Sequence, residues 1–157
     1  MPDNAEWQLA YRDPQTAYEY ARWAGPHDHT RLVACREPPY AYLYARDVDC
    51  TPRDDTRAAT CRCPKWAYYY AADVDKGPRD DTRAVACFDQ QYTLLYAMHI
   101  DKGPRDDTRA AACSHPGWAY YYAREVDKGP RDDTRAAAYG DEYEAGQYCE
   151  TFGNGRF

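Results

Sequence analysis

The sequence predicts an all-α solenoid of six short helical hairpins, about twelve helices in all, and two observations lead to this fold class. The first is a repeat: Gly129–Ala136 recurs letter for letter at Gly103–Ala110 and Gly77–Ala84, and Thr51–Ala58 differs from it only at Thr51. The second is a helical spacing of apolar residues between these segments. Because the repeats follow one another every 26 residues, a stacked array fits the sequence better than one closed core.

The first helix of each repeat is predicted after a proline, as in Pro116–Asp127, since a proline at the first helical position loses no hydrogen bond. Lys128 and Gly129 follow, and glycine is the usual residue just past a helix C-terminus. The residues at i, i+3, i+4 and i+7 form one face: Ala119, Tyr122, Ala123 and Val126. The residues placed to cap these helices are Asp13, Glu37, Cys63, Asp89, His115 and Asp141, of which only aspartate is a strong cap.

The second helix is predicted from Pro130 to about Ala138. Asp132 and Asp133 then lie in its first turn, where negative charge suits the helix dipole. Prolines at the equivalent position mark the start of each hairpin: Pro2, Pro26, Pro52, Pro78, Pro104 and Pro130. We therefore expect one repeat domain over residues 1–157, in which only residues 153–157 form a loose tail.

Composition and charge exclude several classes of partner. The net charge of −6 leaves no broad positive footprint for nucleic acid. No apolar run reaches membrane-spanning length, and no basic and then apolar leader follows Met1. We therefore expect a cytoplasmic protein that binds neither nucleic acid nor membranes. Seven cysteines, an odd number, fit reduced thiols better than a disulfide framework.

The cysteines form a column along the repeats: Cys35, Cys61, Cys87 and Cys113. Equivalent positions of stacked helices lie about 8–10 Å apart. A disulfide needs Cα atoms within about 7 Å, so the column cannot bridge itself. A small buried hydrophobic residue is the simpler interpretation. A cysteine-based metal or redox protein is kept only as a remote alternative, and we predict no metal site.

Paired aspartates such as Asp132 and Asp133 recur in the same way. Identical repetition argues against catalysis, because a catalytic site needs different residues that converge at one place. Helix-dipole effects and aspartate–arginine pairs at i+3 explain them. The sequence also has no phosphate-binding glycine loop and no nucleophile–base pair, so we predict no catalytic residue and no cofactor.

A stripe of tyrosine and arginine residues is the best candidate for binding a protein or peptide partner, since these types are enriched at interfaces. In the first-type helix of the fourth repeat, Leu94 and Met98 take the places of the tyrosine and the arginine, and His99 lies beside them. The alternative is that the rings pack between neighbouring repeats. The predicted partner-binding residues are Tyr18, Arg22, Tyr42, Arg46, Tyr68, Leu94, Met98, His99, Tyr120 and Arg124.

The two ends of the chain are complementary in the repeat register, because it begins with a second-type helix and ends with a first-type helix. A head-to-tail contact of this kind that does not close gives filaments or tubes. The residues expected at such an end-to-end contact are Trp7, Leu9, Tyr11, Tyr148 and Phe152.

The segments Pro64–Pro78 and Pro116–Pro130 share Pro-x-Trp-Ala-Tyr, followed by Tyr-Ala and Lys-Gly-Pro. This unit resembles short tandem helical repeats of uncharacterised bacterial and phage proteins. The chain is more distantly similar in architecture to Sel1-like and tetratricopeptide arrays, whose repeats are longer. The resemblance implies an α-helical array and no particular activity. We therefore expect a non-enzymatic protein–protein interaction scaffold, with self-assembly into a structural filament as the alternative.

Overall fold

The computed structural model describes residue 8, residue 10 and residues 12–153. Residues 12–153 form eleven α-helices and four π-helical turns, so the predicted all-α class is confirmed for this part of the chain. The chain divides into two compact units, Met1–Val85 and Ala86–Phe157. Most of the helix predicted after Pro2 lies outside the described residues.

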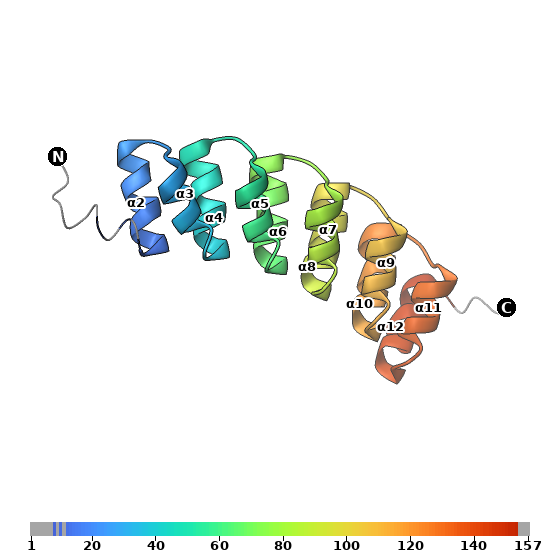
Figure 1. Ribbon diagram of the computed structural model, residues 1–157. Helices are drawn as coiled ribbons and strands as arrows, with labels where there is room; N and C mark the ends of the chain where they lie inside the picture. The colour runs from blue at the N-terminus through green and yellow to red at the C-terminus, as the bar shows by residue number, and fades with distance from the viewer. Residues whose placement is uncertain (1–7, 9, 11, 154–157) are drawn as a thin grey trace. The chain divides into compact units, whose positions relative to one another are not determined.

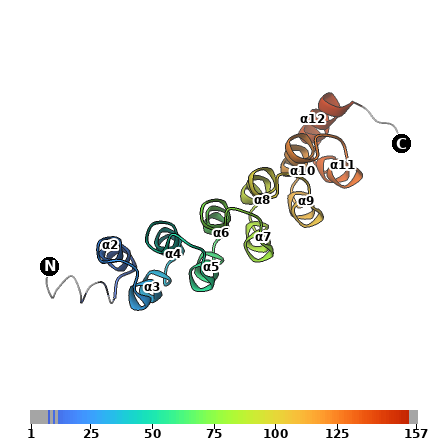
Figure 2. The same ribbon diagram turned by 90° about the horizontal axis from the view of Figure 1, so that it is seen from above.

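The first unit is a series of helix pairs packed one after another (Figure 1). Helices α2, α4 and α6 lie side by side in one row, with α3 and α5 on the other side of it (Figure 2). Each helix of the row contacts the next, and α5 packs against both α4 and α6. The elements are α2 (Pro14–Ala24), α3 (Asp28–Ala34), α4 (Pro38–Tyr44), η1 (Ala45–Asp49), α5 (Asp54–Thr60), α6 (Pro64–Tyr70) and η2 (Ala71–Asp75).

The second unit repeats the same arrangement. Helices α8, α10 and α12 form its row, and α9 and α11 lie on the other side (Figure 2). The elements are α8 (Gln90–Tyr96), η3 (Ala97–Asp101), α9 (Asp106–Ala112), α10 (Pro116–Tyr122), η4 (Ala123–Asp127), α11 (Asp132–Ala138) and α12 (Glu142–Phe152). Helix α7 (Asp80–Ala86) spans the boundary between the two units. Sequential packing of near-identical pairs is the organisation of a helical solenoid.

The core of each unit is the alanine–tyrosine face that the sequence predicts. In every complete repeat the first helix buries a tyrosine between two small residues: Ala41, Tyr44 and Ala45; Ala67, Tyr70 and Ala71; Thr93, Tyr96 and Ala97; Ala119, Tyr122 and Ala123. Helices of seven residues are marginal in water by themselves, so burial of this face against neighbouring helices stabilises them.

Among the residues that precede the first helices, only the aspartates cap the helix with their side chains. All six predicted residues occupy the N-cap position of a helix. Only Asp13, Asp89 and Asp141 accept hydrogen bonds from helix N–H groups through their side chains; in Asp13 this carboxylate lies 2.7 Å from the amide nitrogen of Thr16. Glu37, Cys63 and His115 make no such bond, as expected for poor caps.

The second helices begin two residues later than predicted. Helix α5 begins at Asp54, so Pro52 stands in the connection and Arg53 takes the cap position with an extended backbone. The same holds for Arg105 before α9 and Arg131 before α11. The reason is a contact that the repeat pattern does not show: a tyrosine hydroxyl of the following first helix binds the backbone N–H of Arg53 and holds it outside the helix.

The helix predicted at Pro116–Asp127 ends at the predicted residue, but its last turn is π-helical. Helices α4, α6, α8 and α10 all continue into such a turn, whereas α2 and α12 do not. The residue after the turn has a left-handed φ: 55° for Lys76, 56° for Lys102, 56° for Lys128 and 52° for Cys50. The following glycine, Gly77 in the first case, is not left-handed. Its N–H closes the turn by donating to the carbonyl of Ala71 at 3.1 Å. At these π turns the left-handed residue is therefore the one before the glycine.

Candidate functional site

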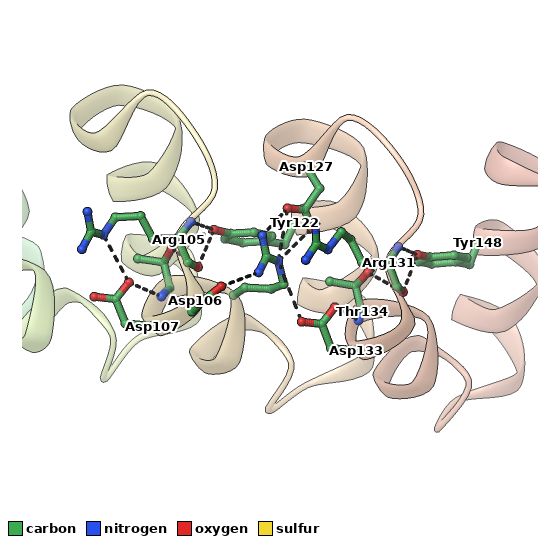
Figure 3. A network of polar contacts seen from close by, with 11 residues as sticks. Arg105, Asp106, Asp107, Tyr122, Asp127, Arg131, Asp133, Thr134 and Tyr148 are labelled. Carbon is green, nitrogen blue, oxygen red and sulfur yellow. Dashed lines mark hydrogen bonds and ion pairs between the residues drawn. The ribbon is translucent and has the colours of Figure 1, made fainter.

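A buried polar network joins the two helices of each hairpin. The Tyr122 hydroxyl lies 2.7 Å from Thr108 Oγ1 and accepts a hydrogen bond from the amide nitrogen of Arg105 at 3.1 Å (Figure 3). Tyr122 belongs to α10 and Thr108 to α9, and both side chains are fully buried. Burial raises the pKa of Tyr122, so the neutral hydroxyl is retained at neutral pH. This hydroxyl is committed to the fold.

The same network recurs along the chain. Tyr44 bonds Thr30 and His27, Tyr70 bonds Thr56 and Arg53, and Tyr148 bonds Thr134 and Arg131. Tyr148 is the residue that the sequence places at an end-to-end contact. Its ring is buried in its own hairpin, where Phe152 packs on it at 4.8 Å between ring centroids. The predicted contact residues Trp7, Leu9 and Tyr11 lie outside the described residues.

An arginine–aspartate pair lies beside each buried tyrosine. The Arg109 guanidinium donates two hydrogen bonds to Asp127 Oδ1, at 2.8 and 3.2 Å, and one to Asp106 at 3.0 Å. It also lies 5.9 Å from the Tyr122 ring centroid. The hydrogen bonds to Asp127 raise the arginine pKa further. Arg31 with Asp49 and Arg57 with Asp75 make the same pairs, which the sequence analysis did not predict. The predicted i+3 pairs are confirmed for Asp54, Asp80, Asp106 and Asp132.

The predicted tyrosine stripe turns inward. Tyr18, Tyr42 and Tyr120 are buried, which is the alternative left open from the sequence. Each hydroxyl reaches a residue of the next hairpin: Tyr18 donates to Asp47 at 2.6 Å, Tyr42 donates to Asp73, and Tyr120 lies 3.0 Å from Thr151 Oγ1. Burial, followed by the hydrogen bond to the carboxylate, raises the pKa of Tyr18 and Tyr42.

The other members of the stripe are divided between surface and core. Arg22, Arg46 and Arg124 are exposed and lie over the rings of Tyr18, Tyr42 and Tyr120 at 5.8, 5.0 and 5.3 Å from the centroids. Met98 and His99 are exposed, and Tyr68 is partly buried. Leu94 packs against the buried cluster of Ala97, Ala112, Tyr122 and Val126. The partner-binding role of these residues stays a prediction.

The exposed aromatic residues of the first helices are ones that the sequence reasoning missed. In each Tyr-Tyr-Tyr run the middle ring faces outward: Tyr69 is 36% exposed and Tyr121 is 40% exposed, whereas Tyr70 and Tyr122 are fully buried. The helical period contains the signal, because Tyr121 lies two residues, about 200°, from the buried Ala119. Trp66 and Trp118, three residues earlier, share this side.

In the first unit the equivalent residues lie on α4 and α6. Trp66 and Tyr69 lie 5.9 Å apart between ring centroids, and the buried Tyr42 ring touches both, at 5.4 and 6.0 Å. Leu43 of α4 packs against the same buried cluster as Trp66. The Lys65 ammonium lies 4.9 Å from the Trp66 ring centroid.

In the second unit the equivalent residues lie on α8 and α10. Trp118 and Tyr121 are 6.0 Å apart, and the Arg124 guanidinium lies 4.9 Å from the Tyr121 ring centroid. Tyr92 and Leu95 take the same two positions on α8. We call these eight residues the outer aromatic row: Tyr40, Leu43, Trp66 and Tyr69 in the first unit, and Tyr92, Leu95, Trp118 and Tyr121 in the second.

The cysteine column is held in partly buried positions. Burial raises the pKa of Cys35, Cys61 and Cys113 to about 11, which keeps these thiols protonated and poorly nucleophilic. Cys50 is exposed and takes the left-handed position at the end of η1. Among the described residues, no three His, Cys, Asp or Glu side chains are grouped closely enough to hold a metal ion.

Comparisons with known proteins do not identify a family for these repeats. No protein-family model, no curated protein and no solved structure matches the chain. In the described part of the chain, none of the helices has the length and apolar character needed to cross a bilayer. The chain is therefore described as a tandem array of helical repeats of about 26 residues.

Proposed function

We propose that the chain is a non-enzymatic interaction scaffold whose outer aromatic row binds a peptide segment of a partner protein. One observation supports this above the others. Tyr69 and Tyr121 are exposed beside Trp66 and Trp118, while Tyr70, Tyr120 and Tyr122 of the same helices are buried in contacts within and between hairpins. Tryptophan and tyrosine are the residue types most enriched among binding hot spots.

The side chains of the outer aromatic row pack against neighbouring residues, which favours binding without a conformational change of the row. Trp66 and Leu43 rest on the buried cluster of Tyr42, Ala45, Tyr70 and Val74. Tyr121 lies between the Trp118 and Tyr120 rings, with Arg124 above it. Rings that are held in this way lose little conformational freedom on binding, so more of the contact energy remains as affinity. Stacked helical repeats typically use such extended surfaces to bind partners.

The test is a selection of displayed random peptides on the immobilised protein. Two substitution sets remove the row: Tyr69→Gln with Tyr121→Gln, and the same pair with Trp66→Thr and Trp118→Thr. The repeats themselves tolerate these residues, since Gln147 and Thr16 occupy the equivalent positions. The control is Phe88→Ser, which removes a ring that is 83% exposed outside the row, where Ser114 is the equivalent residue.

We expect peptides that bind the wild-type protein and the Phe88→Ser variant, with affinity about 30-fold lower for the variants of the row, as for loss of a hot-spot residue. Circular dichroism checks that each variant keeps its helicity. Peptides that bind all variants equally would place the binding surface elsewhere. A library that gives no binder to the wild-type protein would contradict the proposal.

A further inference from the structure

Three lysines adopt a backbone conformation that disfavours them. Lys76, Lys102 and Lys128 have φ of 55–56° at the end of the first helices, and all three side chains are exposed. The left-handed region brings Cβ close to the backbone, so glycine and, less often, asparagine are the usual residues there. In each case a glycine is the next residue, but it does not take the left-handed position. The backbone alone does not explain why lysine stands here.

The charges around these lysines are already paired with one another. After Lys76, Asp80 forms an ion pair with Arg83 at 2.7 Å and Asp81 forms one with Arg79 at 3.5 Å. Asp106 is held by Arg109 at 3.0 Å and Asp107 by Arg105 at 3.6 Å. No carboxylate of the described residues lies within ion-pair distance of Lys76 or Lys102. Lys128 has one long contact, 3.7 Å to Glu125.

Each lysine stands at the end of a helix that bears the outer aromatic row. Lys76 ends the helix of Trp66 and Tyr69, and Lys128 ends the helix of Trp118 and Tyr121. Lys102 ends the helix of Leu95. Within each unit, exposed ammonium groups therefore accompany an apolar surface, as expected where a partner supplies both apolar side chains and negative charge.

We infer that the partner segment is an acidic peptide. Its apolar side chains lie on the outer aromatic row of one unit, and its carboxylates pair with the lysines of that same unit, which are Lys76 in the first unit and Lys102 and Lys128 in the second. The inference rests on the proposed function and adds the chemistry of the partner to it. A cation at a helix C-terminus also interacts favourably with the helix dipole. Stability and binding must therefore be measured on the same variants.

The experiment returns to the displayed library. The peptides selected on the wild-type protein are sequenced, and the strongest is synthesised with a fluorophore, together with a version in which each Asp and Glu is replaced by Asn and Gln. Both are titrated by fluorescence anisotropy at low and high salt. The protein variants are Lys76→Gly, Lys102→Gly and Lys128→Gly combined, and Cys50→Lys, which adds a lysine at the equivalent left-handed position.

We expect selected peptides rich in Asp and Glu, an affinity that falls with salt, and a loss of roughly tenfold for the triple glycine variant, as for the exposed ion pairs of one unit. The glycine variant should melt at or above the wild-type temperature, which separates lost binding from lost folding. Cys50→Lys should bind more tightly. Selected peptides without acidic bias, or equal affinity for the neutral version, would overturn the inference while leaving the scaffold function intact. Absence of any binder would overturn both.

Discussion

Tyr122 and Thr108 meet through their hydroxyl groups at 2.7 Å, in a part of the hairpin where neither side chain contacts solvent. The sequence separation of 14 residues is the same for Tyr44 with Thr30 and for Tyr70 with Thr56. This contact links the two helices of a hairpin and also fixes the residue before the second helix, through its backbone N–H. The buried tyrosine thus defines the repeat.

Removal of one buried hydroxyl should destabilise the protein. Tyr122→Phe leaves the N–H of Arg105 without its partner, while Thr108 Oγ1 keeps its hydrogen bond to the Arg105 carbonyl. An unsatisfied buried polar group costs about 1–3 kcal/mol. Urea unfolding monitored by circular dichroism should show this loss. The matched control is Tyr121→Phe, one residue earlier on the exposed side of the same helix. Equal stability of the two variants would contradict the assignment of Tyr122 to the core.

The buried and exposed partners of Arg109 should differ strongly in their effect. Asp127 is buried, so Asp127→Ala leaves the buried guanidinium with only the more exposed Asp106 and Asp133 as partners and should cost about 3 kcal/mol. Asp106 binds the same arginine from the surface, so Asp106→Ala should cost no more than about 1 kcal/mol. Urea unfolding of both variants measures the difference. Similar losses would show that the two ion pairs are equally solvated.

The protein should lose stability at alkaline pH through its buried tyrosines. Burial raises the pKa of Tyr18, Tyr42, Tyr70 and Tyr122 above the ordinary value near 10. Because the folded-state pKa exceeds the unfolded one, the stabilisation is complete below pH of about 10 and is lost as the pH rises through the folded pKa. Urea midpoints measured from pH 8 to pH 11 should therefore fall, and less steeply in Tyr42→Phe. A flat profile would contradict the burial of these rings.

The cysteines should react at different rates with a thiol reagent. Cys50 is exposed, whereas burial raises the pKa of Cys35, Cys61 and Cys113 to about 11. Since the thiolate is the reactive form, Cys50 should be alkylated first at neutral pH and the other three much later. Peptide mapping by mass spectrometry after short exposure to iodoacetamide tests this order. Early labelling of Cys61 would show that the column is open to solvent.

Much of the fold could be predicted from the sequence, because the repeat indicates the starts and ends of the first helices, the buried alanine–tyrosine face and the aspartate caps directly. The starts of the second helices and the π-helical form of the last turn could not be predicted. The left-handed residue is Lys76 where the rule points to Gly77, since the π-helical turn moves the chain reversal one residue earlier. Local propensity does not indicate a π turn. Its presence follows from packing of the whole hairpin.

The surface was harder to predict than the core. Tyr120 and Tyr121 are neighbours of the same type, and only the packing of the next hairpin decides that Tyr120 is covered while Tyr121 is exposed. The stripe that contains Tyr18, Tyr42 and Tyr120 has the composition of a binding surface, but tyrosine is equally suited to a half-polar contact between repeats. A helical wheel centred on Ala119 would have drawn attention to Tyr121 and Trp118.

The measurement that tests the account most directly is nitration of the native protein with tetranitromethane, mapped by mass spectrometry, with and without a selected peptide. We expect Tyr69 and Tyr121 to be nitrated in the free protein, and Tyr70 and Tyr122 not to be nitrated. When the peptide is bound, Tyr69 and Tyr121 should be protected from the reagent. Nitration of Tyr70 or Tyr122 in the folded protein, or full reactivity of Tyr69 and Tyr121 in the complex, would contradict the account.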